Sequence, residues 1–230
     1  MSARPGKLLE RLRGSRPDAA ATGASIVGRH FLAQEERPGR VGAVEVERLD
    51  PFLRGLLFTD GTVTRALEVQ MLAPVAVEPL EQSKGSIPAA LSEHLEVEGD
   101  EESIRRRVRI GTDAGEPVLW AESYLLLDRL PPGFMGLLDS APDGIGQSLQ
   151  RVALESYREL LWLGFDDLPA WAGDAAAVEA TIRRLYRIVS GRQATILISE
   201  SFAVCRRGDT YHLAAVAEAA GAGADGESPP

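Results

Sequence analysis

Two distant segments each place one charged residue among apolar residues at the spacing of a β-strand. Residues 104–110 read IRRRVRI, and residues 196–202 read ILISESF. Side chains alternate between the two faces of a strand, so Arg106 and Glu200 each share a face with isoleucines. Burying a charge on an apolar face is costly unless the charge is paired or bound to something. An inward arginine and an inward glutamate would suit a pocket for a small molecule that carries a carboxylate.

The alternation alone leaves other interpretations open. Arg106 fits equally well as a solvated strand end, because arginines also occupy positions 105, 107 and 109. Glu200 fits equally well as an edge-strand charge that points into water. Glu122, in the segment VLWAE, could likewise face a pocket or water, and its neighbours do not distinguish these alternatives.

Composition narrows the class of protein. The chain has 230 residues, with 44% hydrophobic and 26% charged, as in an ordinary soluble globular protein. The net charge of -9 argues against nucleic acid as a partner, because phosphate binding needs basic patches. The single Cys205 fits a reducing compartment. No run of 18 apolar residues occurs, and no apolar stretch follows the basic N-terminus, so we expect a cytoplasmic protein without membrane association.

Familiar catalytic and metal-binding motifs are absent from the sequence. There is no P-loop, no GxGxxG after a strand and no GxSxG. His30, His94 and His212 lie far apart and lack HxxxH or CxxC spacing, so we expect no zinc site. Cys205 has no histidine placed to activate it and is expected to be a small buried hydrophobic residue.

Residue patterns divide the chain into a flexible N-terminal extension (1–41), a folded domain (42–213) and a disordered C-terminal tail (214–230). Within the domain we expect a helix over 49–57, with Asp50 as its N-cap and Pro51 as its first residue. The segment 63–69 is either a helix or a strand. Strands are expected at 75–80, 106–110, 118–127, 187–189 and 194–204, and helices at 145–161 and 178–185. This order predicts an α+β domain with an antiparallel sheet.

An ordered set of short motifs resembles the chorismate pyruvate-lyases. The motifs are LFTDGTVTR at 57–65, the strand with Arg106, GEP at 115–117, IG at 145–146, YRIVSG at 186–191 and ISESF at 198–202, within a match of roughly 48–203. Further matches, AES at 121–123, DRLP at 128–131 and DLPAW at 167–171, are similar to the branch that makes 4-hydroxybenzoate for phenolic lipids or specialised metabolites.

The resemblance implies a single antiparallel sheet of about six strands, flanked by helices, with an enclosed site. It implies removal of pyruvate from chorismate to leave 4-hydroxybenzoate, with no metal or cofactor. The same fold serves as the ligand-binding (UTRA-like) domain of some bacterial transcription regulators. A non-catalytic sensor of a small aromatic acid is therefore an alternative, and a related lyase with a different product is another.

The resemblance also implies roles for four residues. The family's arginine, which binds the ring carboxylate, aligns with Arg106. An ungapped count from the GEP motif would select Arg107, but Arg107 would share its face with two other arginines. The family's glutamate, at the hydroxyl end of the ring, aligns with Glu200. Desolvation there would favour a protonated carboxyl that donates to the departing ether oxygen. The backbone N–H groups of Val63 and Ile145 would complete the binding of the ring carboxylate. The sequence predicts no oligomeric state.

Overall fold

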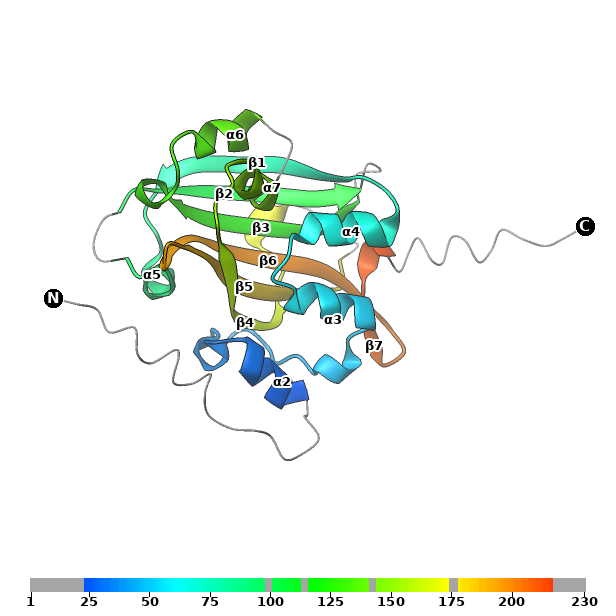
Figure 1. Cartoon of the computed structure of the whole chain (residues 1–230). Helices are drawn as coiled ribbons and strands as arrows, with labels where there is room; N and C mark the ends of the chain where they lie inside the picture. The colour runs from blue at the N-terminus through cyan, green and yellow to red at the C-terminus, as the bar shows by residue number, and fades with distance from the viewer. Residues whose placement is uncertain (1–22, 98–100, 113–115, 141–143, 174–177, 217–230) are drawn as a thin grey trace, which may run out of the picture.

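A single antiparallel sheet forms the centre of the protein. The computed structural model describes residues 23–97, 101–112, 116–140, 144–173 and 178–216. The strands follow the order β1-β2-β3-β6-β5-β4, and β7 pairs with β6 (Figure 1). The predicted fold class is confirmed, and the seventh strand, absent from the predicted count of about six, is the four-residue β7. The strands are β1 (Val75–Gly85), β2 (Ser103–Thr112), β3 (Pro117–Leu126), β4 (Tyr157–Asp166), β5 (Ala180–Ser190), β6 (Gln193–Arg207) and β7 (Thr210–Leu213).

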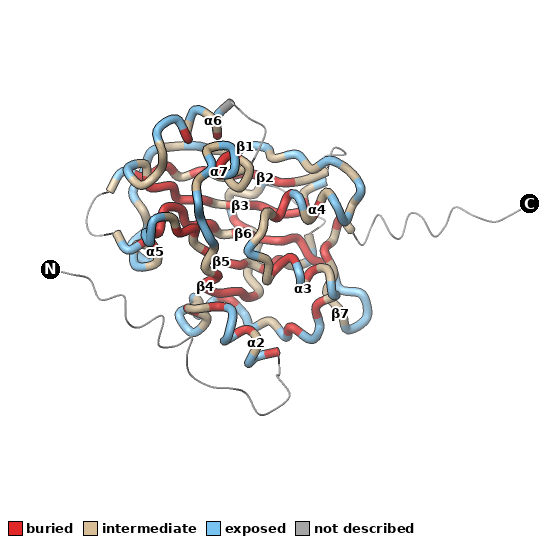
Figure 2. The backbone as a smooth tube through the Cα atoms, in the orientation of Figure 1, coloured by how far each residue is buried: buried red, intermediate tan, exposed pale blue. Residues whose placement is uncertain are grey.

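Helices cover one face of this sheet most fully. The α-helices of the described residues are α2 (Gly23–His30), α3 (Pro51–Phe58), α4 (Val63–Met71), α5 (Ala89–Leu95), α6 (Phe134–Ser140) and α7 (Ile145–Arg151), of which α5 packs on the other face. In Figure 1, α3, α4 and α7 lie in front of the sheet, with α2 near β4. Burial is concentrated on the central strands beneath these helices (Figure 2). None of the helices in the described part of the chain is long and apolar enough to cross a membrane.

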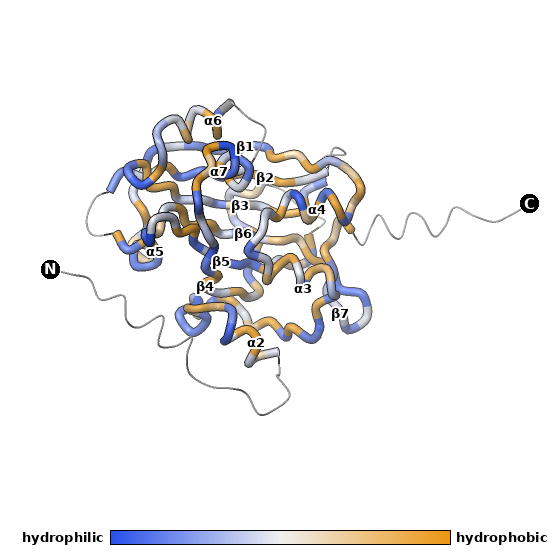
Figure 3. The backbone as a smooth tube through the Cα atoms, viewed as in Figure 1, coloured by the Kyte–Doolittle hydropathy of each residue, from blue (hydrophilic) through white to orange (hydrophobic). Residues whose placement is uncertain are grey.

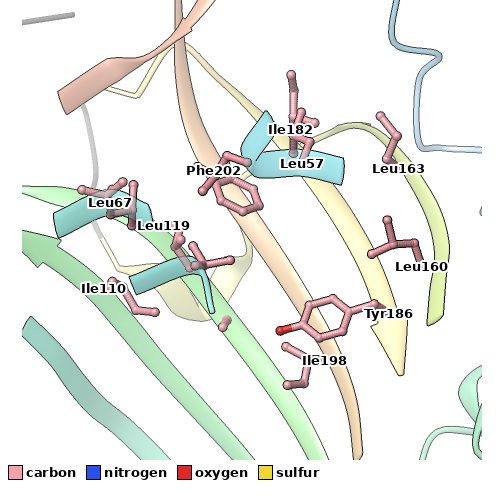
Figure 4. Packing of buried hydrophobic residues seen from close by; sticks show 14 of the residues in the cluster. Leu57, Leu67, Ile110, Leu119, Leu160, Leu163, Ile182, Tyr186, Ile198 and Phe202 are labelled. Carbon is pink, nitrogen blue, oxygen red and sulfur yellow. The ribbon is translucent and has the colours of Figure 1, made fainter. Parts of the chain in front are cut away.

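Helix α3 begins as predicted and carries a large share of the core. The Asp50 carboxylate accepts hydrogen bonds from the N–H groups of Phe52 (2.8 Å) and Leu53 (3.1 Å). Such an N-cap satisfies backbone donors that lack partners within the helix. The apolar face of α3 then packs on the sheet, where Leu57 lies over Phe202 on β6 (Figure 4).

One predicted helix is too long, and another is wrong. The helix expected at 145–161 ends at Arg151, because Ala153 adopts a left-handed backbone (φ 50°), and β4 begins at Tyr157. The segment expected to be helical at 178–185 instead begins β5. This strand is buried on both faces, so its apolar residues do not alternate and their spacing gave a false helical signal. The segment left open at 63–69 is helical.

The second face of the sheet is partly apolar and partly charged. Helix α5 and the segment 33–41 cover an apolar patch that includes Trp162 and Leu185. Hydrophilic and hydrophobic segments alternate along the chain around this core (Figure 3). Residues 23–41 were predicted to be a flexible extension, but here Leu32 N–H donates to the Leu160 carbonyl at 2.9 Å. The apolar residues of this segment explain its packing, since Phe31 is only 2% exposed. The residues 1–22 and 217–230 lie outside the described residues, and the predicted domain boundaries stay a prediction.

The ends of the sheet are irregular. β1 pairs with β2 along one edge, and a bulge interrupts its register between Pro79 and Glu81. At the other edge, Gly42 exchanges backbone hydrogen bonds with Phe165 of β4. The β5–β6 hairpin closes through Gly191 and Arg192, both at positive φ (56° and 68°), as a type I′ turn requires.

Candidate active site

A cavity lies between the sheet and the starts of α4 and α7. Its floor comes from β2, β3, β6 and β5, and its walls from the α3–α4 connection, the start of α7, β1 and β4. All four residues singled out from the sequence line this one cavity: Arg106, Glu200, Val63 and Ile145. Apolar side chains make up much of the remaining lining, namely Val77, Val108, Ile110, Ile188 and Ile198.

Arg106 is a buried cation that contacts no charged group among the described residues. Its side chain faces the cavity from β2, and the residue is 4% exposed. Its Nη1 donates to Oε1 of Gln82 at 2.7 Å, and Gln82 in turn donates to Asp139 at 2.7 Å. Burial lowers the pKa of Arg106, and the more distant Asp139 opposes that shift. An arginine stays protonated in proteins, so the cavity holds a desolvated positive charge.

Arg107 lies on the opposite face of the sheet. Its Nε donates to Glu122 at 2.7 Å, its Nη1 donates to Glu81 at 2.8 Å, and its guanidinium stacks 5.1 Å from the Trp171 ring centroid. Arg105 also pairs with Glu81 on that face. Glu122, left open by its sequence neighbours, therefore belongs to this outer network, and the geometry favours Arg106 over Arg107 for the cavity.

Glu200 lies in a buried ion pair that the sequence did not reveal. Its Oε2 is 2.7 Å from Nε of Arg184, and its Oε1 accepts a hydrogen bond from the Tyr186 hydroxyl at 3.0 Å. Arg184 is completely buried. Its Nη1 also donates to the carbonyls of Leu56, Leu57 and Thr59, at 2.9, 3.1 and 3.1 Å. Arg184 therefore ties the end of α3 to Glu200.

The ion pair changes the chemistry expected of Glu200. A nearby guanidinium stabilises the ionised form of a carboxyl group, whereas the sequence analysis expected a desolvated, protonated one. Tyr186 lies next to Ile198 on the neighbouring strand (Figure 4). Burial raises the pKa of Tyr186 and the charge of Glu200 raises it further, so its hydroxyl stays protonated. The geometry thus supports a Glu200 carboxylate that accepts a hydrogen bond from the Tyr186 hydroxyl.

Val63 and Ile145 are the first residues of α4 and α7. Thr62, before α4, makes no side-chain cap hydrogen bond to the described residues, and Gly144, before α7, has no side chain that could make one. The first N–H groups of a helix have no partner within it, and they carry the positive end of its dipole. Both helix starts line the cavity, so these donors lie at its wall.

Arg158, in a segment predicted to be helical, is a second arginine at the cavity. It is half-buried at the start of β4, and its Nη1 donates to the Asp60 carbonyl at 2.6 Å. Its Nε is buried without a hydrogen-bond partner in the described part of the chain. A Cβ placed on Gly146 would lie 3.2 Å from Nη2 of Arg158, so only glycine fits there without a shift.

The family model described as "Chorismate pyruvate-lyase Rv2949c-like" matches residues 57–207. The chain belongs to this family. A Mycobacterium leprae protein named chorismate pyruvate-lyase is 30% identical over 164 residues, which cover 69% of this chain and 77% of that protein. The Mycobacterium tuberculosis H37Rv protein of the same name is 28% identical over 166 residues, which cover 69% and 82%. The resemblance read from the sequence is thereby confirmed.

Solved structures with a similar arrangement belong to transcription regulators. The effector domain of PhnF from Mycobacterium smegmatis is 16% identical, with a TM-score of 0.46, over 65% of this chain and 90% of that one. A GntR-family regulator from Bacillus cereus is 9% identical, with a TM-score of 0.44, over 56% and 91%.

Replacing Arg184 should destabilise the protein strongly. Arg184→Met leaves the buried Glu200 carboxylate without its cation, which costs about 3–5 kcal/mol. Urea unfolding would measure this loss. Arg109→Met is the matched control, because Arg109 pairs with Glu78 on the exposed face and such pairs contribute about 1 kcal/mol or less.

Adding Glu200→Leu to Arg184→Met should restore part of the lost stability, since no unpaired charge then remains buried. An Arg184→Met protein that unfolds at the same urea concentration as the original chain would contradict the role assigned to the ion pair.

Proposed function

We propose that the protein is a chorismate pyruvate-lyase that converts chorismate into 4-hydroxybenzoate and pyruvate without a cofactor. The observation that carries the proposal is the convergence of Arg106, Glu200 and two uncapped helix starts on one cavity, in a chain of this family. The single Cys205 supports a cytoplasmic location.

The spacing of Arg106 and Glu200 suits a para-substituted aromatic acid. Arg106 on β2 pairs with Ser123 of β3, and Glu200 on β6 pairs with Ala121 of the same strand. Two strand spacings and a two-residue offset separate the two Cα atoms by about 12 Å. A ring of benzoate size fits between two side chains that reach toward each other over β3.

The ring carboxylate binds at the Arg106 end. A guanidinium offers two parallel N–H donors to a carboxylate. The first N–H groups of α4 and α7, at Val63 and Ile145, add donors that carry no net charge. Gln82 on β1 accepts a hydrogen bond from Arg106, so the guanidinium is held in position before the substrate binds.

Glu200 carries the proton of the reaction. As a carboxylate it accepts the ring C4 proton while the bond from the ring to the ether oxygen breaks, and the electron pair of the C4–H bond completes the aromatic ring. The Glu200 carboxyl then gives this proton to the departing enolpyruvyl group, which becomes pyruvate. Arg184 stabilises Glu200 before and after the transfer. The glutamate thus serves as base and then as acid, and the apolar lining limits access of water.

Purified protein mixed with chorismate should release pyruvate and 4-hydroxybenzoate in equal amounts. A lactate dehydrogenase-coupled assay measures the pyruvate, and NMR with mass spectrometry identifies the aromatic product. Correctly folded protein that releases no pyruvate would contradict the proposal. Binding of 4-hydroxybenzoate without turnover would support the sensor alternative, and a different aromatic product would support a related lyase.

Arg106→Gln should lower kcat/KM for chorismate about 10- to 100-fold, because it removes a charged donor to the ring carboxylate. Its affinity for 4-hydroxybenzoate should fall by a similar factor. Arg107→Gln is the matched control and should change both values less than about threefold, because Arg107 lies on the outer face. The reverse ranking would show that Arg107 is the ligand.

Glu200→Gln should lower kcat about 10²- to 10⁴-fold, because an amide cannot take up the ring proton. The affinity of the folded variant for 4-hydroxybenzoate should change much less, since the amide oxygen introduced by this substitution still accepts a hydrogen bond from Arg184. Its stability to urea should fall, because the buried Arg184 loses its counterion. Steady-state kinetics and calorimetric titration measure the two effects, with Glu122→Gln on the outer face as control. A Glu200→Gln enzyme with normal kcat would overturn the proton transfer assigned here.

A further inference from the structure

The cavity holds more positive charge than the ring carboxylate needs. Of the residues that the structure describes, three charged ones line it: Arg106, Arg158 and Glu200. Glu200 is neutralised by Arg184 from outside the lining. Arg106 contacts the neutral Gln82, and Arg158 contacts the neutral Asp60 carbonyl. Two guanidinium groups therefore face one cavity without a carboxylate in direct contact in the described part of the chain.

The Arg158 guanidinium has hydrogen-bond partners for only some of its donors among the described residues. Its Nη1 is held by the Asp60 carbonyl, which fixes the guanidinium against the α3–α4 connection. Its Nε is buried without a partner among the described residues, and leaving a charged donor unpaired there is costly. A purely structural role for Arg158 would require only its hydrogen bond to the Asp60 carbonyl. Its place at the cavity wall, beside a donor that has no partner among the described residues, makes this guanidinium available to an anionic ligand.

The charge of Arg158 reaches the end of the cavity where Glu200 lies. The pKa of Tyr186 is raised first by burial and then by Glu200, while Arg184 and, after it, Arg158 lower it. The positive charge of Arg158 therefore acts on the Tyr186 hydroxyl, which donates a hydrogen bond to Glu200. Arg158 stands on β4 and Arg106 on β2, with three strands of the sheet between them.

We propose that Arg158 binds the second carboxylate of the substrate, the one on the enolpyruvyl group that leaves. This inference rests on the proposed function, because chorismate is a dianion with one carboxylate on the ring and one on the enolpyruvyl group. Arg106 then holds the ring carboxylate, and Arg158 holds the carboxylate of the group that becomes pyruvate. Arg158 is in this sense a substrate-binding residue that distinguishes the substrate from the product, since 4-hydroxybenzoate has lost the carboxylate that Arg158 binds.

The test compares two ligands that differ in the enolpyruvyl group. Arg158→Gln should weaken the binding of chorismate about 10- to 100-fold, as expected for loss of a charged hydrogen bond. Its affinity for 4-hydroxybenzoate should stay within about twofold of that of the original chain. Arg158→Lys keeps the charge and should recover part of the chorismate affinity. Arg109→Gln, an arginine on the outer face paired with Glu78, is the control for general effects on the sheet.

The readout is the ratio of chorismate affinity to 4-hydroxybenzoate affinity. KM, with the inhibition constant of 4-hydroxybenzoate, gives this ratio if the original chain turns chorismate over, and dissociation constants from titration give it if the chain does not. A loss of both affinities by the same factor would assign Arg158 to the ring carboxylate or to a structural role and would overturn the inference. Unchanged affinity for both ligands would overturn it as well.

The two proposals fail in different ways. Absence of pyruvate release by the original, folded chain would overturn the proposed function, whatever the variants do. A normal rate in the original chain, with an unchanged affinity ratio in Arg158→Gln and Arg158→Lys, would overturn only the role of Arg158. If Arg158→Gln fails to fold, Arg158→Lys carries the test, and its ratio should shift in the same direction by a smaller factor.

Discussion

The structure depends on one buried ion pair, between Arg184 and Glu200. Two charges removed from water stabilise each other only when close geometry and further hydrogen bonds offset the lost hydration. Here Arg184 donates through Nε to Glu200 on the sheet and through Nη1 to three carbonyls at the end of α3, where the helix dipole is negative. Its Nη2 has no hydrogen-bond partner among the described residues. The same contacts fix where α3 ends and hence where α4 begins. The contacts of Arg184 therefore determine both the wall that brings Val63 to the cavity and the ionised state of Glu200.

Around this pair, the site is built from charges that differ in how completely they are neutralised. The outer face of β2 pairs its arginines with Glu78, Glu81 and Glu122, so these charges are internally balanced. The cavity face leaves Arg106 with an amide and Arg158 with a carbonyl. Neutral partners hold a guanidinium in position without cancelling its charge. A pocket of this kind favours anions although the whole chain carries a charge of -9.

Sequence reasoning succeeded where a local rule determined the outcome. Strand alternation set the inward direction of Arg106 and Glu200, and the Asp50 cap marked the start of α3. It failed for Arg184 and Arg158, because both lie in segments whose apolar spacing indicated helices. A strand buried on both faces gives no alternation, so tertiary packing decides its conformation. The partner of a buried charge also comes from a distant segment, and no local pattern could have joined Arg184 to the end of α3.

The two borders of the sheet are closed in different ways. At β4, the segment around Gly42 supplies backbone hydrogen bonds, so part of the border is already occupied. At β1, Pro79 lacks an N–H group, a bulge breaks the register, and Glu78, Glu81 and Lys84 place charges along the strand. Unprotected, flat borders recruit strands from other chains, and these are the devices that prevent it. These features protect both borders of the sheet against cross-β pairing with another chain.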